Sequence, residues 1–211
     1  MTEALASSPG SADRRARRKA ETRARLLAAA RRLFVERGYH ATRPQDVARA
    51  ADLGAGTFYV HFADKREAFL AFSEQAAEEL MARVRRATEG EPDFAHRLRR
   101  ALEALLAYAD DHPGVLRAAF ADAEVIAAEL PREASLRERL ASSLAGALRE
   151  GMRAGRLRDD LDAEVVAHGV VGFVHHAVAH GTARGLDREV LLDTVTRFCA
   201  RPLARGPEDP R

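Results

Sequence analysis

Apolar residues recur at every third or fourth position along most of the chain, which predicts amphipathic helices throughout. The first predicted helix covers residues 22–37 and carries Leu26, Ala30 and Leu33 on one face. Gly38 is expected to end it, because glycine readily adopts the left-handed conformation found after helix C-termini. Beyond residue 90 the same periodicity predicts five further helices, over residues 93–110, 115–129, 131–154, 161–183 and 187–200.

Two short helices are predicted between the first helix and a long fourth one. The second helix begins within residues 42–45, where Pro44 stands in the first turn and a Thr and a Gln have capping-box spacing. Residues 52–54 break it, and a third helix follows over residues 56–62. Asp64 is expected to cap the fourth helix. Two short helices around a three-residue turn, braced by a longer helix, have the spacing of a helix-turn-helix.

Composition supports an all-helical, folded protein. The 211 residues are 46% hydrophobic, enough for one or two domains with a buried core. β-branched and aromatic residues are sparse, which favours helix over sheet. Cys199 is the only cysteine, so no internal disulfide can form, and a reducing cytoplasm is the expected location.

A membrane protein is not expected. Residues 165–183 lack Asp, Glu, Lys and Arg, but they contain four histidines and three glycines, which makes burial in lipid costly. A helix buried in a protein interface fits this segment better. The N-terminus is polar and basic and resembles no secretory signal.

Charge is distributed unevenly along the chain. The formal net charge is +2, yet residues 1–66 contain 14 Lys or Arg against 7 Asp or Glu, and the remainder contains 20 against 25. A basic N-terminal third suggests a polyanionic partner, although abundant arginines could also cluster by chance. Residues 1–19 are expected to form a disordered basic arm that either lies along DNA phosphates or a minor groove, or is simply solvated.

Two segments carry a resemblance to a known family. Residues 25–42, RLLAAARRLFVERGYHAT, resemble the first helix of tetracycline-repressor (TetR) type regulators, and residues 45–65, QDVARAADLGAGTFYVHFADK, resemble their helix-turn-helix. The resemblance implies an all-α homodimer of about nine helices, with a DNA-binding domain over 20–66, a ligand-binding and dimerisation domain over 67–201 and a frayed tail over 202–211. It also implies a transcription regulator, most simply a repressor released from a palindromic operator by a small molecule.

The resemblance further implies a set of DNA contacts. Thr57, Tyr59, His61 and Lys65 would touch the DNA backbone, and Gln45, Ala55, Gly56 and Val60 would lie near base edges. Arg43 stands where the family usually has a hydroxyl, and it could reach a phosphate itself. Because three of the four base-edge residues are poor hydrogen-bonding groups, affinity should depend on phosphates and DNA shape and fall steeply with salt.

Two further surfaces follow from the resemblance. An apolar pocket for an apolar or amphipathic effector would be lined by Phe72, Leu102, Leu105, Leu106, Phe120, Leu144, Leu148, Phe173 and His176, although a stripe of leucines is more typical of core and most of these residues should simply be core. The last two helices would form the dimer interface through Val166, Val170, Val174, Val178, Leu191, Val195 and Phe198, with Gly169 and Gly172 allowing close approach.

Four histidines on one predicted helix, His168, His175, His176 and His180, leave open a metal-sensing regulator or a helical metalloenzyme. A di-iron bundle would need Glu-x-x-His pairs, which the sequence lacks, and no nucleophile elbow or phosphate loop occurs. We therefore expect no enzyme activity, no cofactor and no bound metal.

Overall fold

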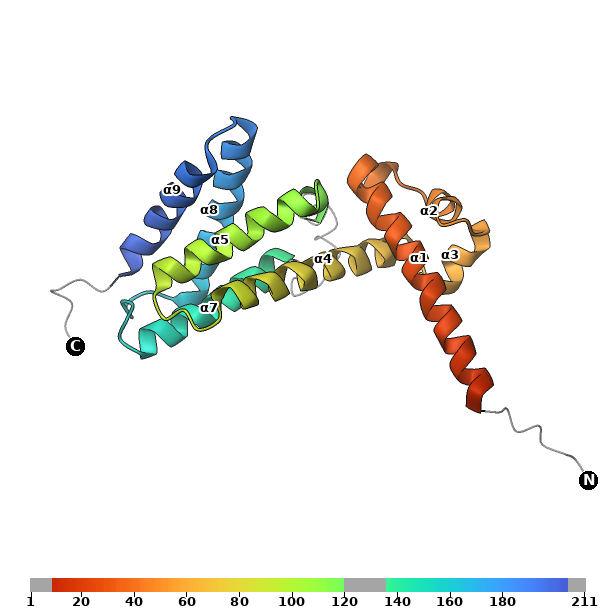
Figure 1. The fold of residues 1–211 in the computed structure, drawn as a ribbon, viewed down its shortest axis with the longest axis horizontal. Helices are drawn as coiled ribbons and strands as arrows, with labels where there is room; N and C mark the ends of the chain where they lie inside the picture. Colours follow the sequence, from red (N-terminus) through yellow and green to blue (C-terminus); the bar gives the residue numbers. More distant parts are fainter. Residues whose placement is uncertain (1–8, 120–135, 205–211) are drawn as a thin grey trace, which may run out of the picture. The chain divides into compact units, whose positions relative to one another are not determined.

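The computed structural model describes residues 9–119 and 136–204, and within them regular structure is helical apart from one isolated bridge between Leu157 and Ala204 (Figure 1). The all-α prediction is confirmed. Residues 115–119 are also helical, and Phe120, with most of the predicted 115–129 helix, lies outside the described residues. The helices are α1 Pro9–Ala41, α2 Pro44–Ala50, α3 Ala55–His61, α4 Lys65–Thr88, α5 Phe94–Asp111, α7 Leu136–Arg153, α8 Ala163–Ala183, α9 Arg188–Ala200 and the 3-10 helix Arg201–Leu203.

The chain forms two compact units that meet within α4, between Ser73 and Glu74. The sequence placed this boundary after residue 66. The first turns of α4 belong to the N-terminal unit because Phe69 and Phe72 are fully buried there against Phe34 of α1, with ring centroids 5.2 and 5.9 Å from that of Phe34.

Helix α1 begins at Pro9, well before the predicted start at residue 22. Residues 9–19 were expected to be disordered, and that expectation is wrong for this segment. Residues 11–37 contain neither Gly nor Pro, and Ala and Arg are strong helix formers. An ion pair between Arg17 and Glu21, one helical turn apart at 3.0 Å, adds to the helix. Gly38 has a φ of 79°, so the predicted end of the main helix is confirmed.

The capping-box spacing predicted that Thr42 caps α2, and this prediction is wrong. Arg43 is the N-cap residue and makes no side-chain capping bond. Thr42 is instead fully buried, and its hydroxyl lies 2.8 Å from the Gly38 carbonyl oxygen and 3.3 Å from that of Leu33. The hydroxyl therefore bonds back to carbonyl oxygens of α1 and does not bond to the backbone N–H groups that begin α2.

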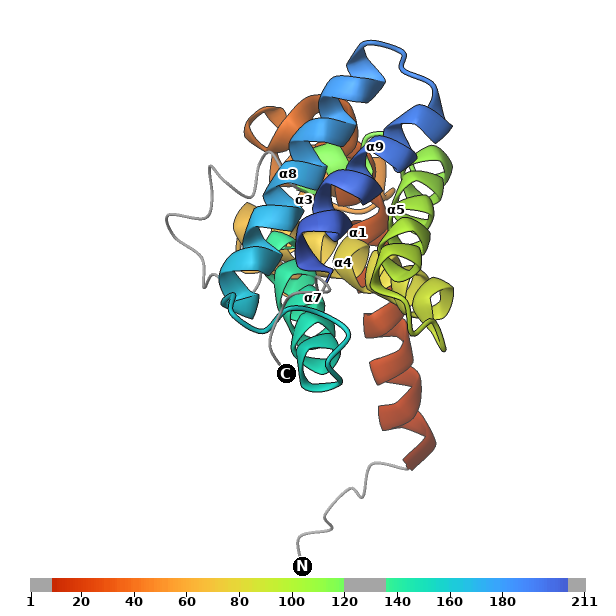
Figure 2. The ribbon, with the colours of Figure 1, turned by 90° about the vertical axis from the view of Figure 1, so that its left-hand side faces the viewer.

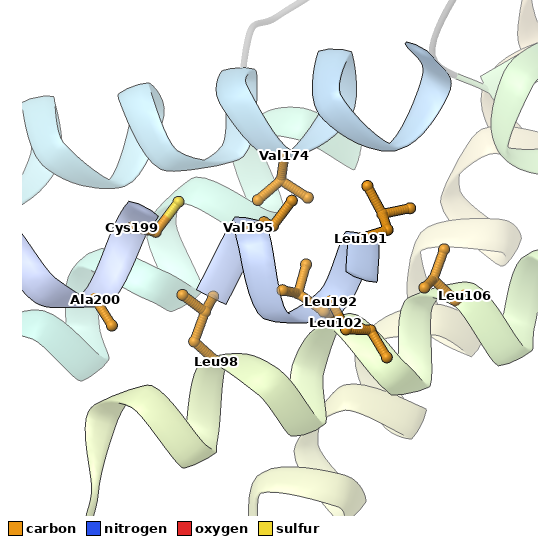
Figure 3. Packing of buried hydrophobic residues seen from close by; sticks show 9 residues of the cluster. All are labelled: Leu98, Leu102, Leu106, Val174, Leu191, Leu192, Val195, Cys199 and Ala200. Atoms are coloured by element: carbon orange, nitrogen blue, oxygen red, sulfur yellow. The ribbon is translucent and has the colours of Figure 1, made fainter. Parts of the chain in front are cut away.

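The C-terminal unit has two hydrophobic clusters. In the first, α9 lies between α5 and α8, and the cluster consists of Leu98, Leu102, Leu106, Val174, Leu191, Leu192, Val195, Cys199 and Ala200 (Figure 3). In the second, α7 packs on α8 through small residues, chiefly Ala141, Ala145, Ala163 and Ala167, together with Leu148, Leu157 and Leu203. Small side chains allow the two helices to approach closely.

Residues 202–204 belong to the folded unit, although they were predicted to be part of a frayed tail over 202–211, and the rest of that prediction lies outside the described residues. Leu203 is buried in the second cluster, and its carbonyl oxygen accepts a hydrogen bond from the Arg158 N–H at 3.2 Å. Burial of one large apolar side chain accounts for this order. None of the helices in the described ranges is long and apolar enough to cross a membrane.

Candidate DNA-binding interface

Helices α2 and α3 are joined by a tight turn in the N-terminal unit (Figure 1). Asp52 adopts a φ of 54° in this turn, a conformation that Asp tolerates better than most residues. The Leu53 N–H donates to the Ala48 carbonyl oxygen at 2.9 Å and closes α2. Gly54 is the N-cap of α3 without a side-chain bond. The geometry is that of a helix-turn-helix.

Helix α3 has two different faces. Phe58 and Phe62 are each 1% exposed, with ring centroids 5.5 Å apart, and they fix the helix to the unit's core. On the opposite side Tyr59 is 53% and Val60 67% exposed. A large aromatic and a β-branched residue held this far into solvent by a rigid helix form a surface suited to a partner.

The remaining predicted contact residues differ in their exposure. Thr57 and His61 are half-buried, and the His61 Nδ1 is buried without a hydrogen-bond partner among the described residues. A side chain built on Gly56 would meet no atom within 4 Å, so this position is open. The fully exposed members of the predicted set are Arg43, Gln45, Ala55, Gly56, Tyr59 and Val60.

Lys65 has a role within the protein that its predicted DNA contact did not include. Its ammonium donates to the carbonyl oxygens of Tyr39 and His40, at 2.9 and 3.4 Å, and lies 4.2 Å from the centroid of the Tyr39 ring. It therefore neutralises the carbonyl end of α1. We interpret Lys65 as a residue that positions the start of α4.

Two arginine side chains of α1 donate hydrogen bonds to the backbone at the end of α2, and no pattern in the sequence indicated either contact. Arg25 donates to the Ala51 carbonyl oxygen at 2.6 Å, and Arg32 donates to that of Ala50 at 3.5 Å. Both acceptors lie at the C-terminal end of α2, where carbonyl oxygens have no helical partner. Only the crossing of the two helices, which local patterns do not specify, brings these groups together.

The N-terminal extension of α1 is basic and starts beside α3. The Arg23 guanidinium lies over the Phe62 ring, 4.7 Å from its centroid. Preceding it on the same helix, five cationic side chains are exposed to solvent: Arg14, Arg15, Arg17, Arg18 and Lys19. We call these five residues the basic arm. From Arg23 to Arg14 a helix rises about 14 Å. The basic arm therefore extends about this far along α1 from the point where Arg23 contacts the end of α3.

A second candidate site is a cavity of about 710 Å³ inside the C-terminal unit. Of the predicted pocket residues, Leu102, Leu105 and Leu144 line it. The others in the described ranges do not. Phe72 is buried in the N-terminal unit, and Leu106 and Leu148 belong to the two hydrophobic clusters. The Phe173 ring stacks on that of Phe198, with centroids 4.3 Å apart, and His176 is exposed.

The predicted dimer residues also divide. Val174, Leu191 and Val195 are buried within the single chain, because α5 supplies the leucines that cover this face of α9. This burial leaves them little area to offer a partner, and their place in the interface stays a prediction. Val166, Val170 and Val178 are half-buried, and the last two line the cavity. Phe198 is 63% exposed, as an interface residue should be.

A different face of α8 and α9 is open to solvent, and these two helices lie in front in Figure 2. Side chains built on Gly169 or Gly172 would meet nothing within 4 Å. This outer face of α8 and α9, as we call it, consists of Val165, Gly169, Gly172, His176, Val190 and Phe198. Its three large apolar side chains are 56–71% exposed, which is typical of a surface that meets another protein.

The histidines of α8 do not gather around one point. The His168 Nδ1 bonds to the Glu164 carbonyl oxygen at 2.8 Å and its Nε2 to Glu138 at 3.2 Å; these bonds, the first above all, raise the pKa of His168. The His176 Nδ1 lies 3.1 Å from the Gly172 carbonyl oxygen. Within residues 9–119 and 136–204 no three His, Cys, Asp or Glu side chains are placed to hold a metal ion, so nothing supports the metal-sensing alternative.

The fold and the two-faced α3 define the class as a helix-turn-helix DNA-binding protein. Residues 26–72 match the family described as "Bacterial regulatory proteins, tetR family". The match covers the helix-turn-helix and the first turns of α4.

Individual proteins agree with that assignment. The chain is 38% identical over 98 residues to the HTH-type transcriptional activator FasR of Mycolicibacterium smegmatis, a match that covers 46% of this chain and 45% of FasR. The fold is similar to the fatty acid degradation regulator FadR of Bacillus halodurans, with a TM-score of 0.70, 18% identity and coverage of 90% and 97%. The fold is also similar to that of SmeT, the repressor of the Stenotrophomonas maltophilia multidrug efflux pump SmeDEF. The TM-score is 0.66 at 19% identity, and the match covers 88% of this chain and 91% of SmeT. These relatives are named as regulators, in agreement with the expectation that the chain is no enzyme.

Proposed function

We propose that this protein is a sequence-specific, DNA-binding transcription regulator that acts as a homodimer on a palindromic operator. The observation that carries the proposal is the outward face of α3, where Tyr59 and Val60 are held in solvent beside a basic arm. A protein that acts on genomic DNA in a bacterium works in the cytoplasm.

The contacts follow from exposure and chemistry. Tyr59, Thr57 and Arg43 would donate to phosphate oxygens, and His61 could do so through its ring. Gln45 could pair with an adenine edge, and Val60 could touch a thymine methyl group. Ala55 and Gly56 would let the backbone of α3 approach the groove closely. Few groups are left for direct readout, so DNA shape should supply part of the specificity.

Dimerisation would use the outer face of α8 and α9. Two copies of Gly169 and Gly172 permit close helix approach, and Phe198 and Val190 supply apolar area around them. A self-complementary patch on two helices of each protomer forms a four-helix, two-fold interface. Two reading heads related by that axis would bind half-sites with centres about 34–36 Å apart or a multiple of that spacing.

Regulation would come from a small molecule in the 710 Å³ cavity, whose size is typical of ligand sites. An effector that favours one arrangement of the two reading heads needs about 1–3 kcal/mol of coupling to switch DNA affinity. The compared proteins include an activator and a repressor. We propose repression, which requires only that the bound dimer block the promoter.

Selection of genomic fragments tests the function. Purified full-length protein is incubated with sheared DNA from its own genome at about 0.15 M salt, and the retained fragments are sequenced. We expect one or a few palindromic sites. A Tyr59→Phe, His61→Ala double variant should keep the fold and the dimer but lose affinity for those sites. If a folded dimer enriches no sequence even at low salt, the proposal is wrong.

A further inference from the structure

The cavity of the C-terminal unit is lined by apolar side chains from α4, α5, α7 and α8 and from the helical residues 115–119. Helix α5 contributes one continuous face, from Phe94 and Leu98 through Leu102 and Leu105 to Ala109. Helix α8 contributes mainly valines and alanines, and α7 contributes Leu140, Leu144 and Ala147. Between Arg97 and Ala109 a helix rises about 18 Å, so the cavity is long enough for an extended or elongated apolar molecule.

Among the described residues that line the cavity, the charged ones are all cationic. Arg85, Arg97 and Arg117 lie in its wall, and none of the described lining residues is Asp or Glu. An apolar cavity whose described wall has three guanidinium groups and no carboxylate is poorly suited to a cation. It suits a molecule that brings its own negative charge.

Two of these arginines lie together at one end. Arg85 is in the last turn of α4 and Arg97 in the first turn of α5, and the short segment 89–93 connects the two helices. Both also line an adjacent polar cavity of about 750 Å³, whose wall has further charges of both signs: Arg86, Arg156, Glu89, Glu91 and Glu150. This end of the apolar cavity therefore opens toward polar surroundings, where a charged group remains partly hydrated.

The two guanidinium groups differ in how they are used within the protein. An Arg97 Nη1 lies 3.7 Å from the Glu150 Oε2, a pair in which Glu150 is 59% exposed. The Arg85 side chain makes no hydrogen bond or ion pair with the described residues. For Arg85, an incoming acidic group would meet no competing carboxylate among the described residues. For Arg97 it would compete with the exposed Glu150 carboxylate.

We propose that the cavity binds an anionic amphiphile, with its apolar body along α5 and a single acidic head, such as a carboxylate or a phosphate or sulfate ester, paired with Arg85 and Arg97. The inference rests on the proposed function only in treating this ligand as the effector. The shape and lining of the cavity support the ligand class independently of any DNA contact.

A series of probes with one chain and three heads tests the class. Binding of decanoate, decan-1-ol and decyltrimethylammonium to the full-length protein is measured by calorimetry at about 0.15 M salt, below the micelle concentrations of the two ionic probes and below the solubility limit of decan-1-ol. We expect decanoate to bind at least about tenfold more tightly than decan-1-ol, and the cation to bind most weakly. Equal affinities for the acid and the alcohol, or no binding of any of the three, would overturn the proposal.

Variants assign the head group to its arginines. An Arg85→Gln, Arg97→Gln double variant should bind decanoate no better than decan-1-ol, while its affinity for decan-1-ol stays that of the wild type. Arg86→Gln removes a neighbouring charge outside the apolar cavity and should keep the preference. Ala101→Phe fills the cavity and should weaken both ligands. If the double variant keeps the full preference for the acid, the assignment is wrong.

The two proposals fail separately. Genomic selection on the same preparation, without ligand, reports the DNA function alone. Operator enrichment with no preference for the acid would leave the regulator intact and remove the ligand class. A clear preference for the acid in a protein that enriches no DNA would leave the cavity assignment intact and remove the regulator.

Discussion

The guanidinium of Arg25 in α1 donates to the backbone carbonyl oxygen of Ala51, 2.6 Å away at the end of α2. This bond crosses 26 residues of sequence and fixes the point where the turn of the helix-turn-helix begins. The spacing between α2 and α3 that a DNA groove would meet is therefore set in part by a side chain from α1.

Removing that donor should destabilise the N-terminal unit. Arg25→Met keeps the aliphatic stem and leaves the Ala51 carbonyl without its partner, which should cost about 1 kcal/mol in the free energy of unfolding. Urea titration followed by circular dichroism measures the change. Arg37→Met alters an exposed arginine of the same helix and should have little effect; equal losses in the two variants would contradict the role given to Arg25.

The basic arm should contribute to DNA affinity through phosphates. Arg14→Gln with Arg18→Gln removes two charges one helical turn apart, so the slope of log affinity against log salt should become shallower by about 1 to 2 units. Titration of a labelled operator at several salt concentrations gives the slope. Arg153→Gln with Arg201→Gln makes the same change in net charge in the C-terminal unit. If both pairs change the slope alike, the arm makes no specific contact.

The outer face of α8 and α9 should control dimerisation. A Cβ at position 169 would meet no atom of the described residues within 4 Å, so a Gly169→Phe protomer should fold while the dimer dissociation constant rises at least about tenfold. Analytical ultracentrifugation measures this constant. Gly146→Phe is the matched control, since Gly146 is an exposed helical glycine of α7 with equally open space. A fully dimeric Gly169→Phe protein would place the interface elsewhere.

His168 should make stability depend on pH. Its bonds to the Glu164 carbonyl and to Glu138 raise its pKa above the usual 6.5. The protonated form is therefore favoured in the folded protein, and its contribution is fully present below the pKa of the unfolded chain and disappears as pH rises through the raised folded pKa. An NMR titration of the imidazole should show the raised pKa in wild type and a lower one in Glu138→Gln; identical midpoints would exclude the Glu138 pair.

Cys199 should be chemically silent until the protein unfolds. It is 6% exposed within the cluster of α5, α8 and α9, and burial raises the pKa of its thiol to about 11. The reactive thiolate is therefore scarce as well as shielded at pH 8. Reaction with an aromatic disulfide reagent should be slow in buffer and rapid in urea. Fast reaction of the native protein would show that α9 detaches from α5.

Local signals in the sequence located most helix ends. Asp64, Asp93 and Asp187 each accept hydrogen bonds from backbone N–H groups at the start of the helices that they were expected to begin. Gly38 and Asp52 adopt positive φ where a helix end and a turn were expected. These features depend on neighbours within a few residues, so a single sequence is enough to predict them.

Long-range partners could not be predicted in the same way. The apolar stripe of α9 could face either a second copy or the rest of its own chain, and periodicity describes both cases equally. The structure turns Leu191 and Val195 toward α5 and leaves Phe198 outside. Thr42 lies between α1 and α2 and could bond to the backbone of either helix. Its hydroxyl bonds to the Gly38 carbonyl oxygen of α1. Such choices are made by packing between segments, which local spacing does not record.

The open space around Gly169 and Gly172 bears on how the sequence can vary among orthologues of this protein. Among the described residues of a protomer, no atom lies within 4 Å of a Cβ built at either position, so folding by itself places little constraint there. Any pressure to keep the two glycines must therefore come from whatever rests on them. Close orthologues collected from many genomes would record that pressure: two positions that remain glycine would trace the partner's footprint, and two that drift freely would show that nothing rests there.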